Sequence, residues 1–344
     1  MPPTSSRLVL VTGGSGYIAG FCIAELLREG WRVRTTLRNL GKTDQVRNSI
    51  AKLGVDPSGI EWAAADLLSD AGWGKAAEGA EYALHVASPL PAVDLKSDDD
   101  YVRPARDGTL RALKAARDAG VKRVVMTSSV AAIAYGRGTR DAPFTEADWT
   151  DETNLADTGP YERSKTLAER AAWAWLAAEG GGLELATVNP SFVLGPILGA
   201  DFSASLDVVK KLLDGSAPLV PRLNFDLVDV RDIARLHVLA MTAAEAAGQR
   251  FIGAGEAYWM KDIAVMLKQG LGDKGKKVPT LPAPDFAVRI LSWVDPVIRG
   301  RLFELGKVRR FSSDKAKRML GWTTRPASET VLDAARSLQA IGVV

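Results

Sequence analysis

A short apolar run that leads directly into a glycine-rich turn and a helical pattern constrains this 344-residue chain more than any other feature. Residues 7–12 read Arg-Leu-Val-Leu-Val-Thr, which predicts a buried parallel strand. Gly13-Gly-Ser-Gly16 follows at once, and apolar residues at helical spacing then continue to Gly30. Gly13 permits a tight turn, and Gly16 lets the backbone approach a pyrophosphate group at the start of the helix. The pattern predicts a dinucleotide-binding unit at the beginning of the chain.

The residues after the second expected strand, 32–37, indicate which nucleotide binds. An Asp or Glu at that position accepts hydrogen bonds from a ribose 2′-hydroxyl and repels a 2′-phosphate. Here the strand is followed by Arg38, with Lys42 close behind. A guanidinium group can hold a 2′-phosphate through a bidentate, charge-assisted contact. The sequence therefore predicts NADPH/NADP+ rather than NAD, with a solvated surface arginine as the alternative interpretation of Arg38.

Strands and helices are expected to alternate through the first half of the chain. Further strands are predicted over 60–65, 81–85, 122–126 and 183–188, with helices over about 101–119 and 161–179. This alternation predicts right-handed βαβ units and an α/β fold with a doubly wound, parallel (Rossmann-type) sheet. Ligands bind such sheets at the carboxyl ends of the strands. That edge is expected to gather Gly13, Arg38, Asp66, Ala87, Ser129 and Asn189, each of which follows a different strand.

After Pro190 the alternating pattern ends, and glycine, proline and large apolar residues become more frequent. A short strand over 225–230 and a helix over 231–244 are expected to return to the first domain, and another short strand begins at Arg250. We predict an NADP-binding domain over 1–190 plus 226–250, and a smaller, partly discontinuous substrate-binding domain over 191–225 plus 251–344. A basic cluster, interpreted as a solvated face or as a contact for an anionic part of a ligand, contains Arg299, Arg301, Lys307, Arg309 and Arg310.

Tyr161-Glu-Arg-Ser-Lys165 places a phenol and an amine on one face of a helix. Thr158 is expected to cap that helix, with Pro160 in its first turn. The positive end of the helix and the Lys165 ammonium both favour a phenolate at Tyr161. A free tyrosine has a pKa near ~10, so acid–base work at neutral pH needs a decrease of roughly 2–3 units. In isolation, a surface helix with an unrelated tyrosine and lysine is the simpler explanation.

Hydride transfer from a dihydronicotinamide leaves negative charge on the oxygen of the acceptor, which then needs a proton and a hydrogen bond. Tyr161 is suited to donate the proton, and Lys165 can also reach the ribose hydroxyls. A serine that follows the strand 122–126 is suited to donate the hydrogen bond. Ser128 and Ser129 are both candidates, because adjacent residues of an extended segment point in opposite directions.

Composition argues against several other classes of protein. The formal net charge is +3, which gives no reason to expect binding to nucleic acid or to a membrane. One cysteine, two histidines and no HExxH sequence argue against a metal site and against a disulfide, which fits a reducing compartment. No apolar run reaches the ~20 residues that cross a bilayer, and no apolar signal segment opens the chain. We expect a cytoplasmic protein, either a monomer or a homodimer.

The motifs together resemble the extended short-chain dehydrogenase/reductase superfamily, and within it the dihydroflavonol reductase-like branch. The stretches that carry the resemblance are Thr12-Gly-Gly-Ser-Gly16-Tyr-Ile-Ala19, Thr127-Ser-Ser129, Tyr161-Glu-Arg-Ser-Lys165, Asn189-Pro-Ser-Phe-Val-Leu-Gly-Pro196, Val228-Asp-Val-Arg-Asp232 and Leu320-Gly-Trp322. The resemblance implies reduction of ketones or aldehydes, with Ser129 rather than Ser128 as the catalytic serine. It also implies a substrate pocket formed by the loop after Ser129 and the region after Pro190.

Two departures from the plant relatives bear on the substrate. Flavonoid-reducing relatives have an asparagine five residues after the catalytic serine, where this chain has Ala134. Relatives that reduce cinnamoyl-CoA have an Asn-Trp-Tyr-Cys-Tyr run that ends on the catalytic tyrosine, where residues 157–161 here read Asp-Thr-Gly-Pro-Tyr. The sequence is more similar to the microbial carbonyl reductases of the branch.

The expected site therefore has three groups of residues and no metal. The catalytic group is Ser129, Tyr161 and Lys165. The cofactor group is Thr12, Gly13, Gly16, Tyr17, Ile18, Arg38, Lys42, Asp66, Leu67, Ala87, Ser88, Thr127, Tyr161, Lys165, Pro190, Ser191 and Val193. The substrate group is Pro89, Val130, Ala134, Ile197, Phe202 and Phe225. The apolar members of the last group predict a preference for bulky apolar or aromatic carbonyls, unless they simply pack the smaller domain.

The leading hypothesis is an NADPH-dependent carbonyl reductase that converts a ketone or aldehyde into an alcohol. A nucleotide-sugar epimerase that retains NAD is one alternative, although such enzymes usually have an acidic residue where this chain has Arg38. A non-catalytic NADP-sensing protein is another, and the intact set of Ser129, Tyr161 and Lys165 argues against it.

Overall fold

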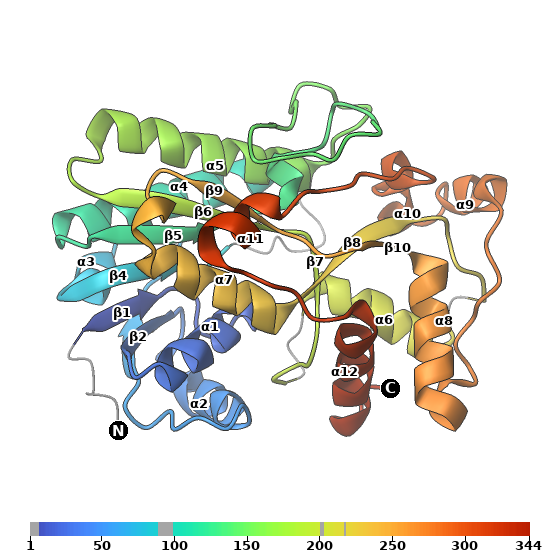
Figure 1. Ribbon diagram of the computed structural model, residues 1–344, viewed down its shortest axis with the longest axis horizontal. Coiled ribbons are helices and arrows are strands. Elements are labelled where there is room, and N and C mark those ends of the chain that lie inside the picture. The colour runs from blue at the N-terminus through green and yellow to red at the C-terminus, as the bar shows by residue number, and fades with distance from the viewer. Residues whose placement is uncertain (1–6, 89–98, 200–202, 217) are drawn as a thin grey trace.

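Seven parallel strands form the central sheet of the molecule, seen in the computed structural model of Figure 1, which describes residues 7–88, 99–199, 203–216 and 218–344. Their order is β3-β2-β1-β4-β5-β6-β9. The strands are β1 (Leu8–Val11), β2 (Arg32–Leu37), β3 (Glu61–Ala64), β4 (Ala80–His85), β5 (Arg123–Thr127), β6 (Glu184–Pro190) and β9 (Arg250–Gly253). The order reverses between β1 and β4, which is where a doubly wound sheet opens a crevice at the carboxyl ends of its strands. The predicted fold class is confirmed.

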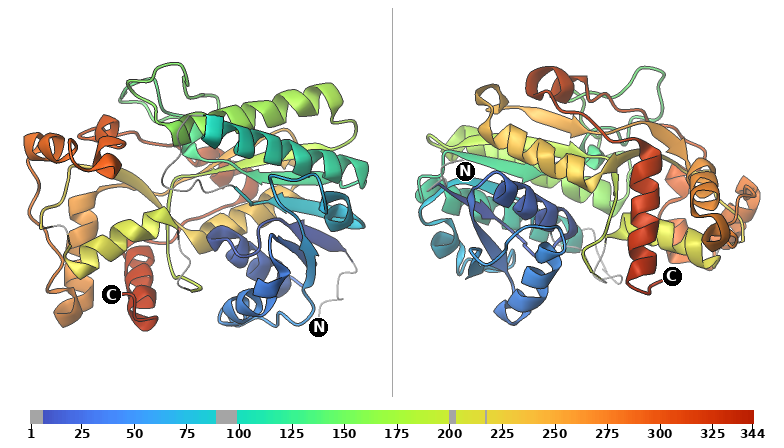
Figure 2. Two further views of the ribbon diagram at one scale, coloured as in Figure 1. Left: turned by 180° about the vertical axis from the view of Figure 1, so that it is seen from behind. Right: turned by 60° about the horizontal axis from the view of Figure 1, so that its bottom comes forward.

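Helices cover both faces of this sheet, as the two views of Figure 2 show. One face packs against α1 (Tyr17–Arg28), α2 (Thr43–Ala51) and α7 (Val230–Thr242), and the other against α3 (Trp73–Ala77), α4 (Asp99–Asp118) and α5 (Pro160–Glu179). Alternate residues of β1 serve the two cores: Val9 and Val11 face the first set of helices, whereas Leu8 and Leu10 face the second. Apolar residues on both faces explain the continuous apolar run from which β1 was predicted.

A second, three-stranded sheet belongs to a smaller part of the molecule. Its strands are β7 (Phe192–Leu194), β8 (Asn224–Asp229) and β10 (Ala257–Trp259), in the order β10-β8-β7. Strand β8 pairs in parallel with β7 and antiparallel with β10. The core of this part is shared with α6 (Ala204–Asp214), α8 (Met260–Leu271) and α12 (Ala327–Ala340). Shorter helices complete the chain: α9 (Asp285–Leu291), α10 (Pro296–Arg299), α11 (Asp314–Leu320), and the 3₁₀ turns η1 (Leu40–Lys42), η2 (Val130–Ala132), η3 (Ala244–Ala246), η4 (Gly272–Gly275) and η5 (Leu302–Glu304).

The two sheets do not coincide with the expected domain boundaries at residues 226 and 251. The expected boundary between residues 250 and 251 falls inside β9, but all of β9 pairs with β6 at the edge of the central sheet. Conversely, β8 lies in the small sheet, and the chain returns to the central sheet only with α7. The side chains of α11 and Trp322 also pack into the central core, and the Trp322 indole donates to the Asp232 carbonyl at 2.7 Å. Short strands carry no sequence signal that identifies the sheet they join, because tertiary packing decides it.

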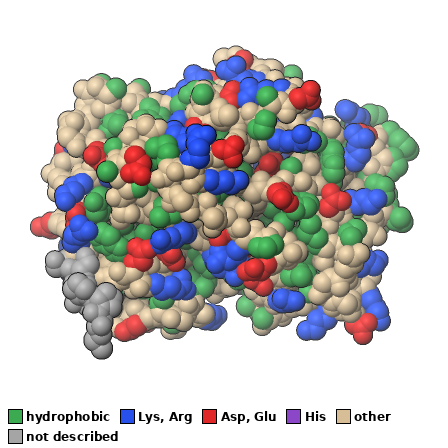
Figure 3. Space-filling model, viewed as in Figure 1, with side chains coloured by type: hydrophobic (Ala, Val, Ile, Leu, Met, Phe, Trp, Pro, Cys, Tyr) green, Lys and Arg blue, Asp and Glu red, His purple; other side chains and the backbone are tan. Residues whose placement is uncertain are grey.

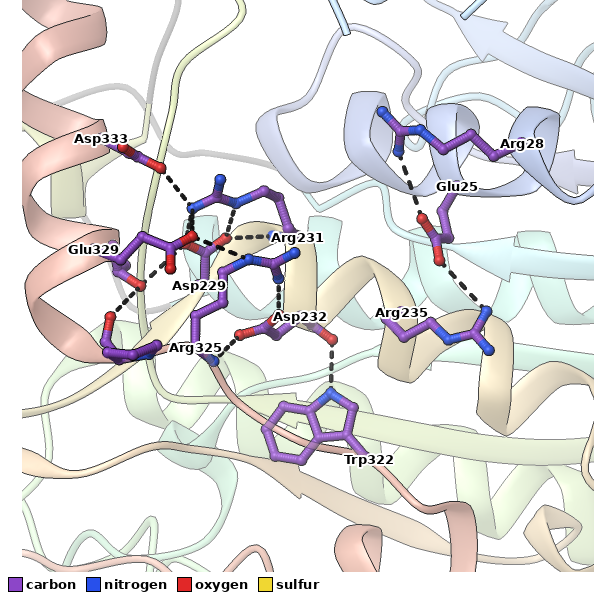
Figure 4. Close-up of polar contacts among 12 residues, drawn as sticks. Glu25, Arg28, Asp229, Arg231, Asp232, Arg235, Trp322, Arg325, Glu329 and Asp333 are labelled. Carbon is purple, nitrogen blue, oxygen red and sulfur yellow. Dashed lines mark hydrogen bonds and ion pairs between the residues drawn. The ribbon is translucent and has the colours of Figure 1, made fainter. Parts of the chain in front are cut away.

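A network of charged side chains fastens α12 to the start of α7 (Figure 4). The Arg231 guanidinium contacts Asp229 at 2.7 Å and Asp333 of α12 at 2.9 Å. Thr330, also on α12, donates to the Asp229 carboxylate at 3.0 Å. Next to this group, Arg325 pairs with Asp232. The network joins the smaller part to the helix that packs on the central sheet.

The outer surface shows no dominant charge on the face in Figure 3, where Lys and Arg side chains are interspersed with Asp and Glu. In the described part of the chain, no helix is both long enough and apolar enough to cross a bilayer. The same residues contain no cluster of His, Cys, Asp and Glu that could hold a metal ion.

Glu169 is a fully buried carboxylate that links α5 to three strands. It accepts hydrogen bonds from Ser128 after β5 at 2.5 Å, from Asn189 of β6 at 2.8 Å and from the Arg250 guanidinium of β9 at 2.7 Å. Arg250 is itself buried, and its guanidinium also stacks 3.8 Å from the centre of the Trp149 ring. A buried carboxylate is stable only while such partners compensate its lost hydration.

We predict that Arg250→Met lowers the free energy of unfolding by about 3–5 kcal/mol, because it leaves Glu169 charged, buried and without its cation. Arg336→Met is the matched control. Arg336 is 61% exposed, and its contact with Asp333 is 3.8 Å long, so its loss should cost only about 0–1 kcal/mol. Urea denaturation followed by circular dichroism measures both values. Equal losses in the two variants would contradict the role given to the buried pair.

Candidate active site

The glycine turn between β1 and α1 leaves no room for side chains. Gly13 has a φ of +72°, and an added Cβ would lie 3.0 Å from the Cα of Ala87, which follows β4. Gly16 begins α1 without any side-chain hydrogen bond among the described residues, so the amides of the first helical turn have no capping partner. A pyrophosphate group can bind amides of this kind at the start of a helix, because the neighbouring glycines have no side chains that would block its approach. This cradle fits a dinucleotide.

Two exposed cations lie beside the cradle. Arg38 directly follows β2, and Lys42 ends the 3₁₀ turn η1. Among the residues that the structure describes, no side chain pairs with either of them. A hollow close by is lined by Gly14, Ser15, Gly16, Tyr17, Lys42, Gln45, Val46, Ser49, Ile50, Leu198 and Gly199. The cations are therefore available to a phosphate group near the glycine turn.

Thr12 organises the ends of β1 and β4. Its hydroxyl accepts a hydrogen bond from the Ala87 amide and bonds to Nδ1 of His85, each at 3.0 Å. Burial lowers the pKa of His85 to about 4, and the nearby charge of Lys165 contributes. His85 is thus a neutral, packed side chain. The exposed Ser88, one residue beyond Ala87, accepts a hydrogen bond from the Lys165 amine at 3.0 Å.

The two serines after β5 point to different partners. The Ser128 hydroxyl donates to Glu169 in the interior at 2.5 Å. The Ser129 hydroxyl accepts a hydrogen bond from the Ala131 amide at 3.1 Å, and it lies close enough to the Tyr161 phenol to lower the pKa of that phenol. The geometry therefore favours Ser129 over Ser128 as the serine that a ligand could reach together with Tyr161, an alternative that strand geometry alone left open.

Tyr161 is the second residue of α5, and it is 37% exposed. Its pKa is raised, chiefly because the site withdraws the phenol from water and also because Glu162 is close; the nearby Ser129 hydroxyl and Arg301 act in the opposite direction. This is the reverse of the lowered pKa expected from the sequence, because burial outweighs the positive influences. Thr158 does not cap the helix either: its hydroxyl donates to the Asn154 carbonyl.

Lys165 lies one turn after Tyr161 and is 9% exposed. Burial lowers the pKa of its amine to about 8, while the Glu169 carboxylate acts in the opposite direction. The amine is 6.0 Å from the centre of the Tyr161 ring and 3.0 Å from the Ser88 hydroxyl. The amine therefore lies between the Tyr161 ring and the end of β4.

Several other expected cofactor residues lie at strand ends with partners of their own. The Thr127 hydroxyl bonds to Nε2 of His237 at 2.7 Å, and Asp66 accepts from the amide of Leu68 at 3.0 Å. The hydroxyls of Tyr17 and Ser191 are buried and have no partner among the described residues. The remaining members are partly or fully buried: Ile18 and Leu67 partly, and Pro190 and Val193 fully.

The expected substrate residues are less open than predicted. Ala134 is fully buried in a small apolar cluster with Val130, so its methyl group faces other side chains. Phe225 stacks on Phe192, with ring centres 4.2 Å apart, and Ile197 packs against the same core of the smaller part. These contacts agree with the alternative that such residues pack the smaller part. The other two expected residues, Pro89 and Phe202, lie outside the described residues.

Sequence reasoning missed Glu169 and Glu162, and it gave Arg301 only as a member of a basic cluster. Glu169 lies four residues after Lys165, as Lys165 lies four after Tyr161, so helical spacing put all three on one face. The burial of Glu162 and the approach of Arg301 from a distant segment have no comparable signal in the sequence.

Comparison with known proteins places this site in a family. The model of the family described as NAD dependent epimerase/dehydratase family matches residues 9–254. Cinnamoyl-CoA reductase 2 of Arabidopsis thaliana is 33% identical over 339 residues, which cover 98% of this chain and 93% of that protein. Tetraketide alpha-pyrone reductase 2 of the same plant is 34% identical over 75% of this chain and 81% of its own length.

Solved structures agree with these relatives. Gre2 from Candida albicans, in complex with NADPH, is 25% identical with a TM-score of 0.79, over 98% of this chain and 99% of that one. The matches, together with the fold and the strand-end site, confirm the resemblance seen in the sequence. The chain belongs to the NAD dependent epimerase/dehydratase family, that is, to the extended short-chain dehydrogenases/reductases, where it is a dihydroflavonol reductase-like oxidoreductase.

Proposed function

We propose that this protein is an NADPH-dependent carbonyl reductase that converts a ketone or aldehyde, preferably an apolar or aromatic one, into an alcohol. The observation that carries the proposal is the proximity of three side chains: the Ser129 hydroxyl acts on the pKa of the Tyr161 phenol, and the Lys165 amine lies 6.0 Å from the centre of the Tyr161 ring. These three side chains come from two separate elements, and they meet at the edge of the sheet where the glycine turn also lies.

NADPH fits the residues at that edge. The glycine turn and the first amides of α1 would hold the pyrophosphate, and Arg38 and Lys42 would contact the 2′-phosphate. The buried, unpartnered hydroxyl of Ser191 supports a polar ligand next to the end of β6. When bound, NADPH supplies the hydride. The similar protein Gre2 from Candida albicans was crystallised with NADPH, which agrees with this choice.

Tyr161 would donate the proton that the carbonyl oxygen needs. With its pKa raised, the phenol is fully protonated at neutral pH, which is the state that a proton donor requires. Ser129 would donate a hydrogen bond to the same oxygen and stabilise its developing negative charge. Lys165 would lower the pKa of Tyr161 as the reaction proceeds, because a nearby ammonium stabilises the phenolate that proton donation leaves.

The substrate class is inferred from apolar side chains and from the relatives. The two plant relatives described above are reductases whose names include cinnamoyl-CoA and tetraketide alpha-pyrone. This chain departs from the plant motifs at Ala134 and at 157–161, so we expect bulky apolar or aromatic carbonyls other than flavonoids or cinnamoyl-CoA. A panel of ketones and aldehydes, each assayed with NADPH and with NADH, tests the proposal. Absence of turnover across the panel would favour the NADP-sensing alternative, and tightly retained NAD in the purified protein would favour an epimerase.

We expect Tyr161→Phe to lower kcat/KM for carbonyl reduction by about 10²- to 10⁴-fold, because the ring remains but its proton is lost. The Kd for NADPH, followed by its fluorescence, should stay nearly unchanged. Tyr258→Phe is the matched control, since that hydroxyl contacts only Glu256 at an exposed site. Reduction by the Tyr161→Phe variant at close to the original rate would exclude Tyr161 as the proton donor.

Arg38→Ala should raise the KM for NADPH by roughly 10- to 100-fold and should leave the KM for NADH nearly unchanged. This factor corresponds to the loss of one charge-assisted hydrogen bond, which contributes about 1.5–3 kcal/mol. Arg28→Ala, at the end of α1, serves as the control. Steady-state kinetics with both nucleotides measure the change. Equal increases for the two nucleotides would mean that Arg38 does not recognise the 2′-phosphate.

Lys165→Met should make the protein inactive and yet more stable near pH 7. The pKa of Lys165 is about 8 in the folded chain against 10.5 as its ordinary value, so the folded state disfavours the ammonium. That penalty is full below pH 8 and shrinks as pH rises towards 10.5, so the gain in Tm should shrink over the same range. Thermal melts of both proteins from pH 7 to 10 test this, with exposed Lys276→Met as the control. A lower Tm for Lys165→Met at pH 7 would contradict the prediction.

A further inference from the structure

Residues 301–309 form a segment of the smaller part that contacts the residues at the beginning of α5. In Figure 1 it belongs to the coil that runs from α10 to α11 beside the loop before α5. Lys307 pairs with Asp157, and Arg309 contacts Asp157 at 2.5 Å and Glu304 at 2.6 Å. These pairs fix the segment against the residues that lead into the helix bearing Tyr161.

The contact nearest to the proposed proton donor is made by Arg301. Its guanidinium donates to Oε1 of Glu162 at 3.0 Å. The other carboxylate oxygen, Oε2, accepts from the amide of Gly159, the residue just before α5, at 2.9 Å. The Glu162 side chain is only 2% exposed, so its charge depends on these two donors for compensation. Glu162 thus closes the first turn of α5 on one side and holds Arg301 on the other.

Phe303 reinforces the same contact. An added Cβ on Gly159 would lie 3.3 Å from the Phe303 ring, so the ring packs closely on the residue that starts the helix. Phe303 also meets the edge of the Tyr135 ring, with centres 6.1 Å apart. The backbone at the start of α5 is therefore enclosed by the segment, and Tyr161 follows two residues later.

We propose that Arg301 is a positioning residue for Tyr161, because its guanidinium holds and neutralises the Glu162 carboxylate that closes the first turn of α5. The inference rests on the proposed role of Tyr161 and adds to it a contribution from the smaller part of the molecule. In this arrangement the substrate-binding part supplies a charge that acts on the proton donor, and not only the wall of a pocket.

Several polar groups lie near Tyr161, and two of them are the paired residues Glu162 and Arg301. The others come from the elements packed around it: Ser129 and Lys165 beside the ring, Ser88 on the Lys165 amine, and Asp157, Glu304, Arg309 and Tyr135 around Arg301. Glu162 raises the pKa of Tyr161 and Arg301 lowers it. While both are present their charges largely cancel, so losing either one should move the pKa of Tyr161, and in opposite directions.

Titration of the Tyr161 phenol in the full-length protein tests this without a known substrate. The near-ultraviolet tyrosinate absorbance of each protein, minus that of the same protein with Tyr161→Phe, gives the midpoint for Tyr161. Arg301→Met should raise the midpoint by about one pH unit, and Glu162→Gln should lower it by a similar amount. The double variant should return close to the original midpoint, and Arg301→Lys should keep it, since the positive charge remains.

Arg299→Met is the matched control, because among the described residues the Arg299 guanidinium donates only to the carbonyls of Ser292 and Trp293. It should leave the midpoint unchanged. Unchanged midpoints in Arg301→Met and Glu162→Gln, or shifts of the same sign in both, would overturn the inference and reduce the pair to a purely structural contact. The role of Tyr161 itself is judged separately, by the activity of Tyr161→Phe.

Discussion

The architecture of the site depends on one buried negative charge, the carboxylate of Glu169. It binds β5, β6 and β9 to the middle of α5, and a buried carboxylate stabilises the fold only with such partners in place. Lys165 is one helical turn earlier and Tyr161 two turns earlier. The interior bonds of Glu169 therefore fix the rotation of α5 against the strand ends, and this rotation points Tyr161 at Ser129. A buried group in the interior therefore sets the geometry of the residues at the proposed site.

Local signals carried much of the sequence prediction. The strands around the cofactor edge were expected within one or two residues of their observed bounds, because buried parallel strands between turn signals are short apolar runs. Arg38 and the glycine turn were recognisable for a similar reason, since each depends on its position next to a strand end. Tyr161 and Lys165 share a helix face, so their proximity followed from spacing alone.

Features that depend on distant packing were not predictable in this way. Which of Ser128 and Ser129 faces Tyr161 depends on Glu169, and the raised pKa of Tyr161 depends on how deeply the neighbouring segments bury it. Strand β9 has four residues, and nothing in them distinguishes an edge of the central sheet from the small one. The basic cluster was expected to be a solvated face or a ligand contact. Three of its members, Arg301, Lys307 and Arg309, instead pair with carboxylates of the protein.

The path of the chain between the two sheets limits how such a protein can change. The chain leaves the central sheet after β6, returns with α7, leaves again after β9, returns with α11 and ends in the smaller part with α12. No single cut separates the two parts, so the smaller part cannot be exchanged as one continuous segment. Recombination would break the fold at several junctions at once. New specificity in a chain of this design is therefore expected to arise by point substitutions and loop changes rather than by exchange of a module.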